Sequence, residues 1–296
     1  MSLFIGLRVA VVLPLVVINT LVHAVPLFVA ALLKAALPGK ALKRMCDRLL
    51  TGLAENWIGV NTLMIGWFTP TRFQVDLPPG LQVDGHYLVL ANHQSWVDIL
   101  VLQKVFNRRI PLLRFFLKRQ LFWVPVLGLA WWALDFPFMG RYTHRQVARN
   151  PELAKRETEA VRRACRKFRD IPVSMMNFVE GTRFTPEKHA RQEAPYRHLL
   201  KPRSGGVAFV LDAMGEGLHA ILDVSIAYPG GRPTMVDLMG GRVPDVRVLV
   251  RERPIPAALV GGNYQQDRAF RAQFQQWLNG LWDEKDADMQ RLMEPR

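Results

Sequence analysis

The first motif that could carry chemistry is a histidine followed closely by an aspartate. In Ala91-Asn92-His93-Gln94-Ser95-Trp96-Val97-Asp98, four residues separate His93 from Asp98. An imidazole held by a carboxylate can act as a general base, because the carboxylate fixes the ring and leaves its second nitrogen free to take a proton. Asp98 has a second possible role, since Ser95-x-x-Asp98 is also a capping box at the start of a helix. The two roles are compatible, and we predict a base that could deprotonate an alcohol.

The second motif is Phe178-Val179-Glu180-Gly181-Thr182-Arg183. Gly181 permits a tight turn, Thr182 offers a hydroxyl, and Arg183 can bind a phosphate through two parallel N–H groups. Glu180 could orient Arg183 or hold a substrate hydroxyl. The alternative is an ordinary polar turn with a surface salt bridge. Ser95 lies outside any Gly-x-Ser-x-Gly sequence, which argues against a serine hydrolase.

These motifs need a scaffold, and the chain after Pro70 has the alternating pattern of an α/β domain. We expect strands at Tyr87–Ala91, Ile110–Phe115, Phe136–Gly140, Val173–Val179, Leu218–Ala227 and Val246–Val250. We expect helices at Ser95–Phe106, around Leu121–Leu134, and at Pro151–Arg169, Ser204–Met214 and Tyr264–Asp283. The predicted fold is a mixed, largely parallel sheet flanked by helices, with both motifs at carboxyl ends of strands. Phe184–Arg203 is expected to be a long loop, and the charged tail after Trp282 to be peripheral.

The amino-terminal region is strongly apolar. Val9–Leu33 contains 25 consecutive residues without formal charge, enough for a helix that crosses a membrane. Polar residues and prolines interrupt it, which makes a kinked or re-entrant hairpin nearly as well supported: Pro14, Asn19, His23 and Pro26. The amphipathic stretch Leu53–Phe68 is expected to lie at the membrane interface or beside the first helix, with a buried helix of a soluble core as the alternative. We therefore predict a membrane anchor at residues 1–70 and an α/β domain at residues 71–296.

The charge distribution indicates an anionic partner. The chain has 39 Lys and Arg against 25 Asp and Glu, a net charge of +14. Val101–Arg169 alone contains 16 basic and 4 acidic residues. Zinc-ligand spacing, an RNA-binding aromatic signature and a glycine-rich nucleotide loop are absent from the sequence, so anionic membrane lipids are favoured over nucleic acid. Cys46 and Cys165 indicate no disulfide framework. Basic residues after the apolar stretch place the rest of the chain on the cytoplasmic face.

The two motifs and their order resemble those of the glycerolipid acyltransferase family, of the 1-acylglycerol-3-phosphate acyltransferase type. The similarity runs from about Leu88 to Tyr228 and includes a middle block with these matching residues: Lys118, Pro125, Gly128 and Arg141. Three positions depart from the family pattern. Val179 replaces a usual proline, and Gly140 replaces a common aspartate. Asp223-Val224-Ser225-Ile226-Ala227-Tyr228 replaces a proline-rich fourth block and is nearer the lysocardiolipin-type branch, which bears on the acceptor's head group.

The resemblance implies a membrane-bound enzyme, with His93 as base and Asp98 as its partner. It implies that a fatty acyl group moves from acyl-CoA or acyl-carrier protein to the sn-2 hydroxyl of lysophosphatidic acid. It assigns the acceptor phosphate to one set of residues: Lys118, Arg141, Glu180, Gly181, Thr182 and Arg183. It implies neither metal nor cofactor. From the resemblance together with the basic residues after the apolar stretch, we expect the inner (cytoplasmic) membrane, with the catalytic domain on the cytoplasmic face.

Alternatives remain at three levels. Another lysophospholipid, such as lysophosphatidylglycerol or lysocardiolipin, could be the acceptor, and a thioesterase or esterase is a weaker possibility. A non-catalytic protein that binds anionic membranes would use the same basic region. Trp123, Trp131 and Trp132 could form an interfacial belt that admits the acyl chain or could pack in the core.

Overall fold

The computed structural model describes residues 2–140, 152, 159, 168 and 171–294. Arg141 lies outside the described residues, as does the helix predicted at Pro151–Arg169 except for its three isolated described positions.

A six-stranded sheet forms the centre of the described structure, in the order β1-β8-β7-β2-β6-β3. Its strands are β1 Arg72–Asp76, β2 His86–Ala91, β3 Leu113–Phe115, β6 Val173–Phe178, β7 Ala220–Ala227 and β8 Asp245–Arg253. Neighbouring strands are parallel except for the antiparallel pair β7 and β8. A separate short parallel pair joins β4 Leu117–Lys118 to β5 Phe138–Met139. The predicted mixed, largely parallel α/β fold is confirmed, although β1 was not expected.

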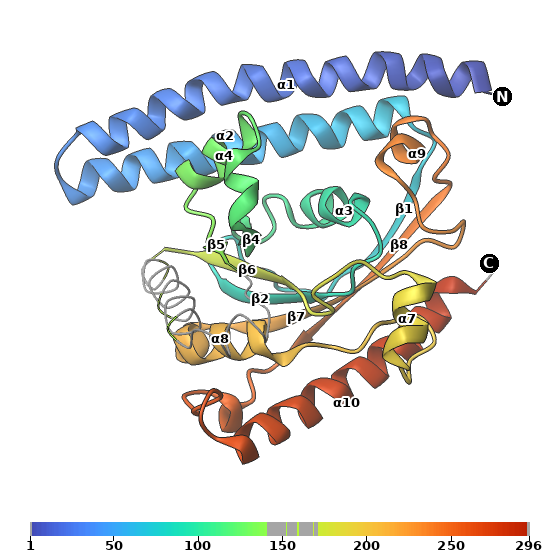
Figure 1. Cartoon of the computed structure of the whole chain (residues 1–296). Helices are drawn as coiled ribbons and strands as arrows, with labels where there is room; N and C mark the ends of the chain where they lie inside the picture. Colours follow the sequence, from blue (N-terminus) through green and yellow to red (C-terminus); the bar gives the residue numbers. More distant parts are fainter. Residues whose placement is uncertain (1, 141–151, 153–158, 160–167, 169–170, 295–296) are drawn as a thin grey trace.

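Helices cover both faces of the sheet (Figure 1). One face carries α1 Ser2–Ala36, α2 Lys40–Phe68, α3 Val97–Phe106 and α4 Leu127–Ala133, and the other carries α8 Ser204–Met214 and α10 Arg268–Met293. Residues of β2 alternate between two hydrophobic cores. Val89 and Ala91 face α2 and α3, whereas Leu88 and Leu90 face α8 and α10. This alternation follows from the two-residue period of a strand.

The apolar amino-terminal stretch belongs to a single helix, α1, so the alternative of a hairpin that turns within Val9–Leu33 is wrong. Instead α1 and α2 lie side by side as two long helices. The polar residues of α1 face α2. Asn19 donates to the side-chain oxygen of Asn61 at 2.9 Å, and the indole of Trp57 donates to Thr20 at 3.2 Å. These bonds satisfy polar groups that would be costly to leave unpaired in apolar surroundings.

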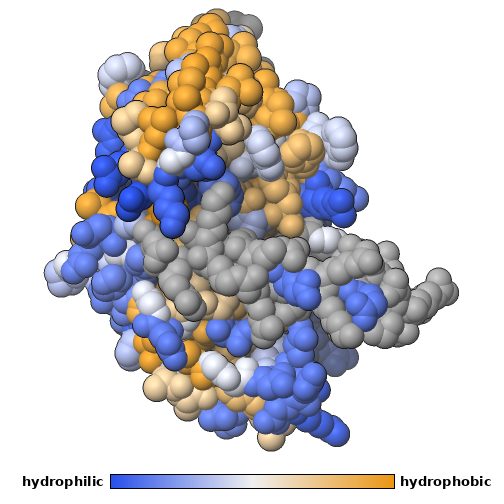
Figure 2. Space-filling view, turned by 90° about the vertical axis from the view of Figure 1, so that its left-hand side faces the viewer, coloured by the Kyte–Doolittle hydropathy of each residue, from blue (hydrophilic) through white to orange (hydrophobic). Residues whose placement is uncertain are grey.

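The outer face of α1 is apolar and exposed. Exposed side chains recur along the helix: Val11, Leu13, Val17, Ile18, Leu21, Val22, Val25, Val29, Leu32 and Leu33. By length and composition, Phe4–Ala36 is the one helix in the described part of the chain that could cross a membrane. Figure 2 shows hydrophobic side chains gathered over this end of the molecule, with hydrophilic ones below them.

The helix expected around Leu121–Leu134 is broken in two. A 3-10 helix spans Arg119–Trp123, and α4 begins at Leu127 after a turn through Pro125 and Val126, where Val126 has φ of 63°. Gly128 permits the close return of the chain, because a Cβ there would lie 1.9 Å from the carbonyl oxygen of Phe122. Trp123 and Trp132 are exposed, so core packing is wrong for these two, whereas Trp131 is half-buried.

Two further expectations are corrected. The segment Phe184–Arg203 contains a helix, α7 Pro186–Gln192, whose first turn is capped by the Thr185 hydroxyl accepting from the Lys188 amide at 3.3 Å. The charged tail is also not peripheral, because α10 continues through Met293 and buries Lys285. A short helix, α9 Met235–Met239, and 3-10 helices at Gly215–Gly217 and Ala257–Leu259 complete the described elements.

Candidate active site

Three neighbouring parallel strands deliver the site residues to one edge of the sheet. His93 follows β2, the turn from Glu180 to Arg183 follows β6, and Tyr228 follows β7. Ala91 pairs with Phe178, so β2 and β6 end level with each other, whereas Ala91 pairs with Val224 three residues before the end of β7. The carboxyl ends of parallel strands are where α/β folds place ligands and catalytic groups.

His93 and Asp98 form a hydrogen bond of 2.8 Å between Nδ1 and Oδ2. Asp98 is fully buried, and the side chain of His93 keeps 14% of its surface exposed. The same Oδ2 accepts the backbone amides of Gln94 at 2.6 Å and Ser95 at 2.8 Å. Asp98 therefore holds the turn that leads into α3 and orients His93 at the same time. The arrangement leaves Nε2 of His93 without a hydrogen bond to any described residue and able to take a proton.

Tyr228 completes the surroundings of Asp98, and sequence reasoning gave it no role. Its hydroxyl donates to Oδ1 of Asp98 at 2.6 Å, across 130 positions of sequence. Burial, with the nearby charge of Asp98, raises the pKa of Tyr228 well above its ordinary value, so the phenol stays protonated and remains a donor. The available signal was position alone: Tyr228 directly follows a predicted strand at the edge where both motifs lie.

Phe178 and Glu180 fix His93 from the β6 side. The rings of His93 and Phe178 are stacked with centroids 3.8 Å apart. Glu180 is 1% exposed, and its carboxylate accepts the backbone amide of His93 at 3.4 Å. Burial raises the pKa of Glu180 well above its ordinary value, and the negative charge of Asp98 raises it further. Hydrogen bonds from the backbone amides of His93 and Leu200 lower the pKa, but the effect of burial is larger. Glu180 thus braces the loop that carries His93, and the expectation that it orients Arg183 finds no contact to support it.

The turn after Glu180 exposes its polar groups. Gly181 has φ of 68°, a conformation that favours glycine. Lys188, another residue without a predicted role, donates to the Thr182 hydroxyl at 2.7 Å and to the Arg183 carbonyl at 2.8 Å. The Arg183 guanidinium lies over the Trp96 ring, 4.9 Å from its centroid. This contact holds Arg183 without neutralising its charge.

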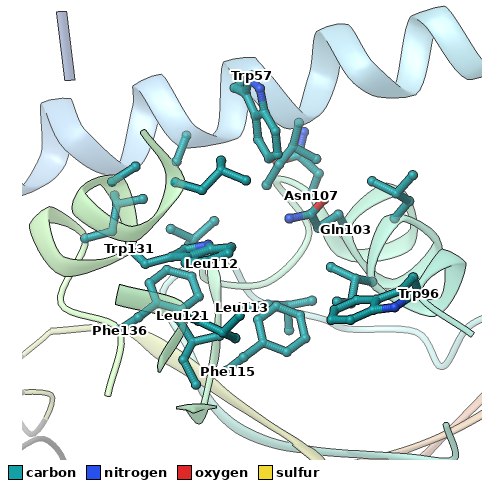
Figure 3. A pocket seen from close by; sticks show the side chains of 18 of the residues that line it. Trp57, Trp96, Gln103, Asn107, Leu112, Leu113, Phe115, Leu121, Trp131 and Phe136 are labelled. Carbon is teal, nitrogen blue, oxygen red and sulfur yellow. The ribbon is translucent and has the colours of Figure 1, made fainter. Parts of the chain in front are cut away.

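A cavity of about 710 Å³ opens from His93 toward the α1–α2 pair. Its lining is mostly apolar and comes from α1, α2, α3, α4 and β3. Figure 3 shows Trp57 and Trp131 on the helical side, Trp96 at one end, and Phe115 and Phe136 below them. Such a cavity suits an alkyl chain, since apolar surface is transferred out of water on binding.

The structure brings most of the predicted site residues to this cavity. His93, Lys118, Gly181, Thr182 and Arg183 line it, and Lys118 is exposed. Asp98 and Glu180 lie behind His93 and are buried. Among the described residues, no group of three or more His, Cys, Asp or Glu side chains is placed to hold a metal ion.

Comparison with known proteins settles the family. A family model described as Acyltransferase matches residues 72–228, which include β1, both motifs and Tyr228. The chain belongs to the glycerolipid acyltransferase family. It is 26% identical over 215 residues to the mouse 1-acyl-sn-glycerol-3-phosphate acyltransferase gamma, covering 68% of this chain and 52% of that protein. It is 26% identical over 269 residues to the zebrafish (Danio rerio) lysocardiolipin acyltransferase 1, covering 83% of this chain and 64% of that protein.

The solved structure of the LPA acyltransferase PlsC from Thermotoga maritima aligns with a TM-score of 0.49 and 14% identity, over 91% of this chain and 98% of that one. This family member spans about half the length of the mouse gamma relative that it matches. The resemblance predicted from the two motifs is confirmed, including the relation to both branches, the 1-acylglycerol-3-phosphate type and the lysocardiolipin type.

Proposed function

We propose that this acyltransferase moves a fatty acyl group from acyl-CoA or acyl-carrier protein to the sn-2 hydroxyl of lysophosphatidic acid, giving phosphatidic acid. One observation carries the proposal. The His93–Asp98 pair, bonded at 2.8 Å, opens onto an apolar cavity of about 710 Å³ whose lining also includes Lys118 and Arg183. A base, a space for a hydrocarbon chain and cations for a phosphate are the three requirements of this reaction.

The geometry of the pair supports the following reaction. Nε2 of His93 removes the proton from the acceptor hydroxyl, and Asp98 stabilises the imidazolium that forms. The resulting alkoxide attacks the thioester carbon, and the tetrahedral intermediate collapses with cleavage of the carbon–sulfur bond. The imidazolium returns its proton to the departing thiolate, so the enzyme ends the cycle unchanged. No covalent acyl-enzyme is needed, since the acceptor oxygen itself is the nucleophile.

The acceptor phosphate is assigned to Lys118, Arg183 and, from the family pattern, Arg141. Lys118 and Arg183 line the cavity with His93, while Gly181 and Thr182 form the turn that leads to Arg183. Arginine can bind a phosphate through two N–H groups, and lysine adds a compact charge. Glu180 supports this site from behind by holding the His93 loop.

Membrane association is proposed through the exposed apolar face of α1. Trp123 and Trp132, 81% and 59% exposed, add aromatic surface of the kind enriched at membrane interfaces. The cavity reaches residues of α1, including Ala24 and Leu27, so the helix proposed to contact lipid also lines the proposed acyl site. We place the catalytic groups at the cytoplasmic face of the inner membrane, where the basic residues after α1 would meet anionic lipids.

A second acceptor class has a specific observation in its favour. The chain matches lysocardiolipin acyltransferase 1 of zebrafish over 83% of its length, and Tyr228 of the divergent fourth block contacts Asp98. Acylation of lysocardiolipin or lysophosphatidylglycerol is therefore the alternative to lysophosphatidic acid.

An acceptor panel tests the proposal. Membranes containing the protein are given labelled acyl-CoA with lysophosphatidic acid, lysophosphatidylglycerol or lysocardiolipin, and then with acyl-carrier protein as donor. Phosphatidic acid as the main product supports the proposal. Products from the other acceptors alone would show that the acceptor is one of them and not lysophosphatidic acid. Release of free fatty acid without an acceptor would indicate a thioesterase. Membrane binding without any turnover would indicate a non-catalytic protein.

A further inference from the structure

A second hollow lies beside the His93 loop and has a different character from the apolar cavity. It encloses about 570 Å³ and is lined from the ends of the same three strands: Gln94, Ser95, Trp96, Arg183, Arg232, Pro233, Thr234, Met235 and Val236. Trp96, Arg183 and Met235 line both spaces, whereas His93 and Lys118 line only the apolar cavity and Arg232 only the second hollow. We call this second hollow the arginine cleft.

Both arginines of the cleft are held against aromatic rings. Arg183 lies over Trp96, and the Arg232 guanidinium lies 5.1 Å from the centroid of Phe184 and donates to the Phe184 carbonyl at 3.0 Å. Stacking on a ring leaves guanidinium N–H groups at the edge available to a second partner. A planar fork of this kind matches the oxygens of a phosphate.

Neither arginine forms a salt bridge within the part of the chain that the structure describes. No carboxylate there lies within 4.0 Å of Arg183 or Arg232. The exposed carboxylate of Glu187 attracts Arg232 from a greater distance, and Asp237, just beyond the cleft, pairs with Arg242. Lys188 is already occupied by Thr182 and the Arg183 carbonyl. Two cations without a salt bridge, at one concave site next to the catalytic loop, attract an anion.

We propose that the arginine cleft is a second phosphate-binding site, separate from the Lys118 side of the apolar cavity. This inference rests on the proposed acyl transfer and extends it to a substrate that carries more than one phosphate. Two substrates of the reaction have this chemistry: acyl-CoA, through the phosphates of its nucleotide, and an acceptor such as lysocardiolipin, through its second phosphate. Arg232 binds this second phosphate, and Arg183 lies between the arginine cleft and the apolar cavity.

The test uses Arg232→Ala, with Arg271→Ala as the matched control because Arg271 is an exposed arginine of α10 that donates to the Gln265 carbonyl. KM and kcat are measured with palmitoyl-CoA and with palmitoyl-pantetheine, which lacks phosphate, and with lysophosphatidic acid and lysocardiolipin as acceptors. Loss of a charged phosphate contact should raise KM roughly tenfold or more, with kcat little changed.

The pattern of KM changes identifies which substrate binds in the arginine cleft or shows that neither does. A higher KM for palmitoyl-CoA, with an unchanged KM for palmitoyl-pantetheine, assigns the cleft to the donor nucleotide. A higher KM for lysocardiolipin but not for lysophosphatidic acid assigns it to the acceptor. If every KM of Arg232→Ala equals that of Arg271→Ala, the cleft binds neither substrate and the proposal is wrong.

A binding measurement separates this proposal from the proposed function. If the wild type transfers no acyl group to any lysophospholipid, the proposed function fails. Calorimetric titration with CoA and with lysocardiolipin then tests phosphate binding in the arginine cleft independently of acyl transfer. Weaker binding of either compound by Arg232→Ala than by Arg271→Ala supports the phosphate site. Equal binding of both compounds by the two variants overturns it.

Discussion

Replacing Tyr228 with phenylalanine removes one hydroxyl and leaves the ring in place. The hydroxyl is 2.6 Å from Oδ1 of Asp98, in a fully buried environment where water cannot substitute for it. The substitution leaves the neighbouring titratable groups in place: Glu180, which interacts with Asp98, and Lys285, which interacts with Glu180. Without the donor, the negative charge of the pair is less well stabilised, so the pair holds an additional proton more tightly. The protonated pair cannot act as a base, and the acid limb of the pH profile must move upward.

The size of the shift follows from the bond. A hydrogen bond to a charged group contributes about 1.5–3 kcal/mol, and one pH unit corresponds to about 1.36 kcal/mol. Asp98 keeps the amides of Gln94 and Ser95 as donors, so the lower end applies and we expect a shift of about one pH unit. At pH values well above the acid limb, kcat/KM of Tyr228→Phe should be only modestly lower than that of the wild type.

The assay is kcat/KM for acyl transfer between about pH 5 and pH 9, a range that brackets the ordinary titration of histidine. Tyr87→Phe is the control, because Tyr87 is also buried but its hydroxyl accepts from the Gln82 amide at 3.0 Å, away from Asp98. An upward shift in Tyr228→Phe alone supports the reasoning. A uniform loss of rate with an unmoved limb would show that Tyr228 has only a packing role and would refute it.

Three further predictions concern stability and specificity. Because the pKa of Glu180 is raised in the folded state, the wild type should lose stability as the pH rises above the ordinary carboxyl pKa of 4.5. Glu180→Gln lacks this titration, so its Tm should increase relative to that of the wild type as the pH rises. Parallel curves of Tm against pH would contradict this. Lys285→Met leaves the buried Asp223 with Arg253 as its remaining salt-bridge partner. The free energy of unfolding, measured in urea, should fall by about 3 kcal/mol. A change below about 1 kcal/mol would show that the Lys285–Asp223 pair contributes little. Ala130→Trp fills part of the apolar cavity and should shift the kcat/KM ratio from palmitoyl-CoA toward octanoyl-CoA by roughly tenfold, whereas an unchanged ratio would place the acyl chain elsewhere.

The sequence predicted the parts of the structure that are encoded locally. Tyr87–Ala91 and Val173–Phe178 are short apolar runs, and their burial between two helical layers makes them strands. The His93–Asp98 contact joins residues five positions apart, so motif spacing was enough to anticipate it. The capped start of α7 was equally local, since Thr185 precedes Pro186, but its signal was overlooked within an apparent loop.

Contacts between distant segments were beyond this reasoning. Tyr228 reaches Asp98 across 130 positions, and only the order of β2, β6 and β7 in the sheet brings them together. The composition of the charged tail predicts a peripheral segment, yet Lys285 is buried because β7 supplies Asp223 as its partner. Asn19 interrupts an apolar span in the sequence, and only the fold shows its partner, Asn61, on the neighbouring helix.

The most direct test of the account compares the wild type with His93→Ala in an acyl-transfer assay on membranes, using labelled acyl-CoA and lysophosphatidic acid. His86→Ala serves as the control, since His86 lies at the opposite end of β2. The account predicts phosphatidic acid from the wild type and from His86→Ala, and a rate lower by about 10²–10⁴-fold in His93→Ala. Phosphatidic acid formed at the same rate by all three proteins would show that His93 is not the base.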